Sequence, residues 1–135
     1  MINNTPDLYQ GDIIFVKNLR FRDTSTVDTR LNGHPVLVLN VANIGERFYG
    51  LKISGSYNYS EGLENYYIIK PNRSNGLKKT SYIDLRYIYE NECKNIPCAG
   101  QIYENEFNNI MKQLDKVQEK YKNENYEKLK KYYKE

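Results

Sequence analysis

The sequence predicts a mainly β fold that ends in a helical region, as a small β-barrel or curled antiparallel sheet with a packed helix. Two observations support this prediction. Between residues 11 and 102 the apolar residues occur in short runs or alternate with polar ones, and turn residues separate these segments. From Glu104 onward the apolar residues repeat with helical spacing. At 135 residues the chain has the length of one domain with a sizeable core.

Two short strands are expected on either side of a long polar loop. A turn signal at Gly11 precedes an apolar strand over residues 13–16. Residues 17–33 are polar and irregular, and a loop of this length in a compact domain is often functional. Pro35 then begins a strand over residues 35–41, because proline lacks the N–H of a ladder donor and suits a first strand position. The unbroken apolar run behind it predicts a buried strand.

The remaining strands are expected at shorter intervals. Residues 47–54 alternate from Phe48 onward, as in a half-buried strand that follows a hairpin turn at 43–46. A second loop at 55–62 comes next. Further strands, with a turn between the first two, are expected at 66–69, at 81–89 with a slip or bulge, and at 99–102.

The C-terminal segment has the pattern of an amphipathic helix. One apolar stripe contains Phe107, Ile110, Met111, Leu114 and Val117. Tyrosines continue the stripe beyond a polar interruption at 122–125. We expect residues 1–118 to form the barrel domain with its packed helix, and residues 119–135 a charged, tyrosine-rich helical extension.

Charge and composition restrict the function classes. The net charge of +3 comes from eight lysines against five carboxylates after residue 111, and the body of the chain is neutral. Bulk charge therefore excludes a strongly basic nucleic-acid binder, so any RNA contact must come from a local arrangement. The chain has 14 tyrosines and no tryptophan, and tyrosine serves as core filler, interface anchor or stacking platform.

The sequence also bears on the location of the protein and on metal or cofactor binding. No segment has the pattern of a membrane span or signal peptide, which favours a cytoplasmic protein. Cys93 and Cys98 form a C-x4-C pair far from the single histidine, a poor zinc pattern. We expect neither a metal nor another cofactor.

The order of motifs resembles the MazF/PemK family of toxin endoribonucleases. The residues that carry the resemblance are G-D-I-I-F-V at 11–16, G-H-P-V-L-V-L at 33–39, L-K-I-S at 51–54, the strand at 81–88 and G-Q-I at 100–102. The resemblance covers roughly residues 9–118 in order and spacing. It implies an SH3-like barrel plus a long terminal α-helix, usually as a homodimer. It also implies metal-free cleavage of single-stranded RNA by 2′-hydroxyl attack, held in check by a protein antitoxin.

Four candidate catalytic residues follow from the resemblance. The family's arginine before the strand proline and its Thr or Ser at the end of the next strand correspond to His34 and Ser54. Histidine at this position can act as acid or base near neutral pH, whereas arginine would supply a fixed charge. Arg30 on the same loop can supply that charge, and Asp84 matches an acidic residue that some members place near the site.

RNA-binding candidates are basic or aromatic and lie in the loops or on the same strands. Guanidinium groups on a loop can clamp phosphates, and loop tyrosines can stack on unpaired bases, although a solvated loop and simple loop packing are the competing interpretations. These candidates are Arg20, Arg22, Lys52, Tyr57, Tyr59, Tyr82 and Arg86.

Two other functions remain open on the sequence. The change from arginine to His34 is also expected of a non-catalytic SH3-like module that binds RNA or a protein and derives from the toxin fold. A structural accessory protein that acts through its C-terminal helix is the third hypothesis.

Overall fold

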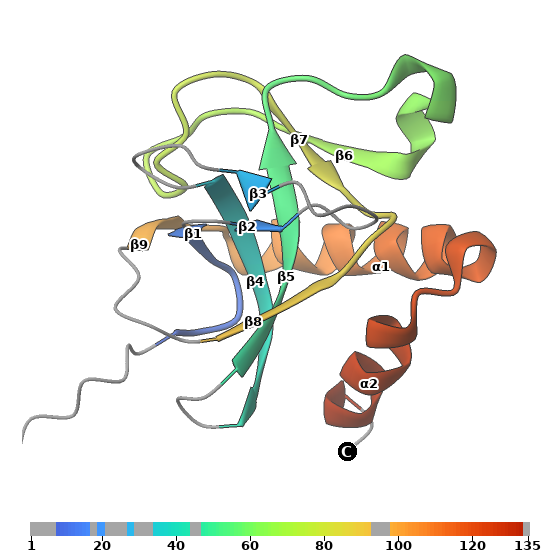
Figure 1. Cartoon of the computed structure of the whole chain (residues 1–135). Helices are drawn as coiled ribbons and strands as arrows, with labels where there is room; N and C mark the ends of the chain where they lie inside the picture. Colours follow the sequence, from blue (N-terminus) through green and yellow to red (C-terminus); the bar gives the residue numbers. More distant parts are fainter. Residues whose placement is uncertain are drawn as a thin grey trace, which may run out of the picture.

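The computed structural model describes residues 8–16, 19–20, 27–28, 34–43, 47–92 and 98–133. Within these ranges the fold is mainly β: an antiparallel sheet curls into a half-barrel, and helix α1 lies against one of its faces (Figure 1). This confirms the predicted class of a curled antiparallel sheet with a C-terminal helical region. No helix in the described part of the chain combines the length and apolar character that crossing a bilayer requires.

Seven strands of the described residues form the sheet in the order β6-β7-β5-β4-β1-β9, and β8 also pairs with β5. Their bounds are β1 Asp12–Val16, β4 His34–Asn43, β5 Arg47–Ser54, β6 Tyr66–Ile69, β7 Ser81–Asp84, β8 Tyr89–Glu92 and β9 Cys98–Gln101. The short strands β2 (Leu19–Arg20) and β3 (Val27–Asp28) pair with each other within the predicted polar loop. The expected turn at 43–46 lies largely outside the described residues.

The strand expected over residues 81–89 is divided into two, which corrects the sequence prediction. β7 pairs with the end of β5, where Ser54 lies opposite Tyr82, and β8 pairs with its beginning, where Gly50 lies opposite Tyr89. Between them, the Asp84 carboxylate accepts the backbone N–H of Arg86 at 3.0 Å. A side chain that bonds its own backbone two residues on competes with the ladder, and this explains the break.

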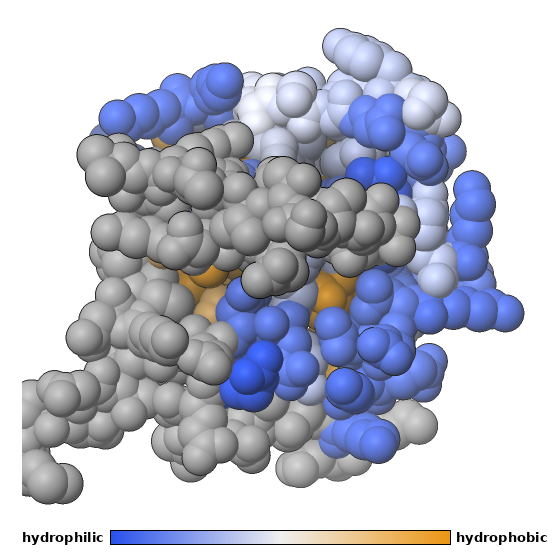
Figure 2. Space-filling view, viewed as in Figure 1, coloured by the Kyte–Doolittle hydropathy of each residue, from blue (hydrophilic) through white to orange (hydrophobic). Residues whose placement is uncertain are grey.

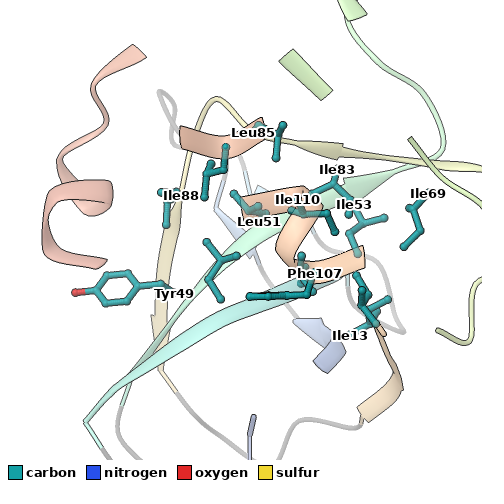
Figure 3. Packing of buried hydrophobic residues seen from close by; sticks show 14 of the residues in the cluster. Ile13, Tyr49, Leu51, Ile53, Ile69, Ile83, Leu85, Ile88, Phe107 and Ile110 are labelled. Carbon is teal, nitrogen blue, oxygen red and sulfur yellow. The ribbon is translucent and has the colours of Figure 1, made fainter. Parts of the chain in front are cut away.

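The central strands are buried on both faces, as the apolar run in β4 predicts. On one face Leu51 and Ile53 pack with Phe107 and Ile110 of α1 in the main core (Figure 3). Leu37 of β4 belongs to the same cluster. On the opposite face a second cluster contains Leu8, Ile14, Val16, Val36, Val38 and Phe48. We call this side the helix-free face, because α1 covers the other one.

Close packing on the helix-free face requires a glycine in β5. A Cβ on Gly50 would lie 2.5 Å from Cγ1 of Val36 and 3.0 Å from the carbonyl oxygen of Leu37. Glycine therefore lets β4 and β5 approach each other under the second cluster.

The helical region folds back on the body of the protein. Helix α1 (Glu104–Tyr121) ends at Lys122, whose positive φ of 49° breaks the helix, and α2 (Glu124–Tyr133) follows. Leu129 of α2 is fully buried in the main core, and the Asn125 side-chain amide donates to the carbonyl of Ile88 at 2.7 Å. Leu129, beyond the predicted boundary at 118, thus belongs to the same core as the sheet, and α1 itself runs through that boundary.

Candidate functional site

The register of the sheet aligns three of the proposed site residues in one row. Val36 of β4 lies opposite Lys52 of β5 as the last pair of this ladder, and His34 and Ser54 each lie two residues beyond it, on the same face of the sheet. Ser54 in turn lies opposite Tyr82 of β7. Alternation of side chains puts all three on the helix-free face, on neighbouring strands.

His34 forms the inner end of this row and is only 1% exposed. Its Nδ1 lies 2.9 Å from the carbonyl oxygen of Pro35. A carbonyl oxygen only accepts hydrogen bonds, so the contact places a proton on Nδ1 and, in the neutral ring, the lone pair on Nε2. The contact with the backbone of β4 therefore favours the tautomer that carries its proton on Nδ1.

Ser54 occupies the middle of the row at the last position of β5 and is partly exposed. Lys52 lies two residues earlier on the same face and is also partly exposed. A hydroxyl and an ammonium group two positions apart on one strand face can both donate hydrogen bonds to a phosphate.

Asp84 and Arg86 form a buried ion pair beside the row. Arg86 donates from Nε to Oδ1 at 3.0 Å and from Nη2 to Oδ2 at 2.9 Å. The hydrogen bond to Asp84 raises the pKa of Arg86 above its ordinary value and keeps the guanidinium charged. Asp84 is one of the candidate catalytic residues that the resemblance implies, and this bidentate geometry suits a residue that orients its neighbour.

Four tyrosines cluster at the outer end of the row. The ring of Tyr57 has its centroid 4.5 Å from that of Tyr59, 4.9 Å from Tyr82 and 5.7 Å from Tyr66. Tyr59 is 81% exposed, whereas Tyr66 is buried. The surface over β6, β7 and the adjoining loop is correspondingly pale, while the surface over α2 is strongly hydrophilic (Figure 2). We call these four residues the tyrosine cluster.

Arg86 connects the tyrosine cluster to the ion pair. Its Nη2 donates to the Tyr66 hydroxyl at 2.8 Å, and its guanidinium carbon lies 5.2 Å from the centre of that ring and 5.0 Å from the ring of Tyr87. Burial raises the pKa of Tyr66, and the Asp84 carboxylate adds to this, while the Asn58 amide and Arg86 act in the opposite direction. Tyr66 therefore stays a neutral phenol at physiological pH.

The loop that carries Tyr57 and Tyr59 is held by hydrogen bonds from outside the sheet. It contains two 3-10 turns, η1 (Tyr59–Glu61) and η2 (Leu63–Asn65). The Tyr121 hydroxyl of α1 donates to Glu61 Oε2 at 3.1 Å, and the Asn65 amide donates to the Tyr121 hydroxyl at 3.2 Å. The end of α1 thus fixes the loop that carries the exposed tyrosines.

The first-loop arginines are only partly placed. Arg20 lies in β2 opposite Val27, and Arg22 and Arg30 lie outside the described residues. Within the described ranges, no group of three or more His, Cys, Asp or Glu side chains is arranged to hold a metal ion.

Sequence reasoning missed Tyr66, Glu61 and Tyr121 as parts of the site. The signal for Tyr66 was present, because it shares strand parity with Ile68, which lies opposite Tyr82. Nothing in the local sequence pairs Glu61 with Tyr121, because the two residues are 60 positions apart.

Comparison with known proteins adds no assignment. No protein-family model and no curated protein matches this chain in sequence.

Proposed function

We propose that this chain is a metal-independent endoribonuclease of the MazF/PemK type, with an SH3-like barrel that cleaves single-stranded RNA. The observation that carries the proposal is the row His34–Ser54–Tyr82 on the helix-free face, with the tyrosine cluster at its outer end. It brings together a proton acceptor, a hydroxyl donor and an aromatic platform from three different strands.

The proposed reaction is an internal transfer at one phosphate. The ribose 2′-oxygen attacks the adjacent phosphorus, its proton passes to Nε2 of His34, and the bond to the 5′-oxygen breaks. A proton then returns to the leaving oxygen, which gives a 2′,3′-cyclic phosphate and a free 5′-hydroxyl. Ser54 Oγ hydrogen-bonds a non-bridging phosphate oxygen, and Lys52 stabilises the charge of the pentacoordinate state. Arg30 and Asp84 are the remaining members of the proposed catalytic set, with Asp84 in an orienting role.

The buried state of His34 sets a condition on this mechanism. At 1% exposure the ring contacts substrate only if RNA binding opens this end of the sheet. Binding energy from bases stacked on the tyrosine cluster can be used for such an opening.

Cleavage of a long unstructured RNA in the presence of EDTA tests the proposal. The expected products carry 5′-hydroxyl ends, and Ser54→Ala should reduce the rate while Ser60→Ala, an exposed hydroxyl in η1, should not. RNA that remains intact under these conditions would contradict the proposal.

The proposal extends to location and partners. We infer a cytoplasmic homodimer whose activity is neutralised by a protein antitoxin. Co-expression with the product of the adjacent gene should relieve growth arrest if that gene encodes the antitoxin, and arrest that persists would exclude it as the partner.

A second candidate function is a non-catalytic module that binds single-stranded RNA or a protein partner. The observation that favours it concerns two of the candidate catalytic residues. His34 is buried, and Asp84 forms an ion pair with Arg86. Growth arrest that both His34→Ala and Ser54→Ala abolish would exclude this candidate. Binding of RNA without arrest or cleavage would favour it.

A further inference from the structure

A groove lies between η2 and helix α1, outside the row of site residues. Its volume is about 550 Å³, and Lys112, Lys116 and Lys120 line it together with Glu64, Asn65 and Val117. The three lysines are spaced four residues apart, so they form a ladder about 12 Å long on one face of the helix.

The helix face that carries this ladder has the composition of a phosphate-binding surface. Helical spacing places Asn105, Asn109 and Gln113 beside the lysines, while Asp115 and Glu119 border the ladder on its other side and Glu64 lines the groove. In the described part of the chain, no ion pair joins these lysines to a carboxylate, although the Lys120 ammonium lies 5.5 Å from the ring centre of Tyr121. Lysine, asparagine and glutamine are the side chains that contact nucleic-acid backbones.

The groove is joined to the tyrosine cluster by fixed contacts. Gln113 Nε2 donates to the carbonyl of Tyr66 at 2.9 Å and to that of Glu64 at 3.2 Å. The loop between the two sites is held by Tyr121 through Glu61 and Asn65. The same β6 edge therefore carries the tyrosine cluster on one side and borders the lysine ladder on the other.

We propose that Lys112, Lys116 and Lys120 bind the phosphate backbone of the RNA strand as it leaves the tyrosine cluster around the β6 edge. The proposal rests on the proposed function, because it names the path of the same RNA. Aromatic stacking next to a basic groove is the arrangement by which proteins bind single strands without sequence preference.

The lining of the groove favours a phosphate backbone over an acidic protein segment. Val117 is the one apolar residue among the lining residues of the described chain, and it is 7% exposed. A docked peptide would require apolar anchors, whereas phosphates require only charge and hydrogen-bond donors.

The test measures binding of 2′-O-methyl oligouridylates, which lack the 2′-hydroxyl nucleophile and report affinity without cleavage. A probe of about five nucleotides covers the tyrosine cluster alone, and one of about twenty reaches the lysine ladder. The variant carries Lys112→Gln, Lys116→Gln and Lys120→Gln. The control carries Lys70→Gln, Lys128→Gln and Lys131→Gln, which remove the same charge from exposed positions elsewhere.

The ladder variant should bind the long probe roughly tenfold or more weakly at moderate salt, with a salt dependence reduced by about two counterions. Its affinity for the short probe and the affinity of the control variant for both probes should stay at the wild-type value. Equal affinity and salt slope in wild type and ladder variant would overturn the proposal, as would an equal loss for both probes.

Two further outcomes distinguish failure of the lysine-ladder proposal from failure of the proposed nuclease activity. If a polyglutamate peptide binds wild type but not the ladder variant, while RNA binding is unchanged, the groove takes an acidic protein segment and the proposal fails. If the long probe behaves as expected but unmodified RNA is never cut, the binding path stands and the proposed nuclease fails.

Discussion

Arg86 is the residue through which the sheet, the tyrosine cluster and the loop at 55–62 are joined. It pairs with Asp84, donates to the Tyr66 hydroxyl, and lies 3.9 Å from a Glu61 oxygen. Arg86 and Asp84 side chains are 11% and 9% exposed, so removal of one leaves the other charge buried. A structural role of this kind explains why an arginine and an aspartate lie next to the site although both are largely buried.

Arg86→Ala should therefore lower the free energy of unfolding by ~3–5 kcal/mol, the usual cost of leaving a buried charge unpaired. Chemical denaturation measures this change. The control is Arg47→Ala, whose partner Glu90 is a surface residue at 3.4 Å and whose loss should cost less than ~1 kcal/mol. Equal costs for the two variants would show that the Asp84 pair is not structural.

His34→Ala should reduce RNA cleavage by ~10²–10⁴-fold, the range expected when an acid–base group is lost. Because His34 is buried, the variant must be compared at equal folded fraction, measured by circular dichroism. His34→Gln keeps a polar side chain of similar size and should be as inactive as the alanine variant. Full activity in His34→Gln would remove proton transfer by histidine from the mechanism.

Tyr59→Ala should weaken RNA binding by ~1–3 kcal/mol if a base stacks on this ring. The side chain is 81% exposed, so its removal should leave stability almost unchanged. Tyr103→Ala removes a tyrosine that is 53% exposed at the start of α1 and should not alter RNA affinity. Similar losses of RNA affinity in both variants would indicate that exposed tyrosines bind RNA non-specifically rather than at one stacking site.

At the scale of elements, α2 packs against the main core and does not project away from it. Leu129 is fully buried and belongs to the main core, while its neighbour Lys128 is exposed. Contacts between α2 and the long strand β4 support the same conclusion.

Leu129→Ala should destabilise the protein by ~2–5 kcal/mol, as expected for a buried leucine, whereas Lys128→Ala should have little effect. Thermal or urea unfolding measures both. If Leu129→Ala leaves stability unchanged, α2 does not contribute to the core in solution.

The fold of each element was largely predictable, and the exceptions have physical causes. The strands near residues 13–16, 35–41, 47–54 and 66–69 and the start of the helix at Glu104 are confirmed, because each has a local signal in the form of an apolar run, an alternation or helical spacing. The single strand expected over 81–89 was wrong, because the bond from Asp84 to the Arg86 amide ends the ladder there. Alternation alone does not show where a side chain accepts a hydrogen bond from a nearby backbone amide and so ends a strand.

At the scale of the whole molecule, tyrosines that are buried or partly buried contribute to the response to alkaline pH. Burial is the first cause that raises the pKa of Tyr66, Tyr67 and Tyr126 above the ordinary value of 10.0. At Tyr126, a hydrogen bond to Asp115 acts in the same direction. The folded chain therefore holds these protons more tightly than the unfolded chain.

Their contribution to stability should be complete below about pH 10 and should be lost as pH rises through the raised pKa values. The unfolding midpoint in urea should decrease over this range, while the absorbance of tyrosinate shows ionisation delayed beyond that of free tyrosine. Tyr126→Phe removes one of these protons and should make the decrease shallower. A midpoint that does not change with alkaline pH would contradict this prediction.

The sequence by itself determined the class of the fold and the positions that can carry chemistry. Apolar runs, alternation and helical spacing are local, so they revealed most strands, the terminal helix and the strand positions of Ser54 and Tyr82, whereas His34 was expected just before its strand and is its first residue. Only the tertiary structure decided how these residues meet. Register between strands placed Ser54 opposite Tyr82, burial enclosed His34, and contacts between distant segments held the tyrosine loop. Register, burial and long-range pairing depend on how elements pack, and that information is not present in any single stretch of the chain.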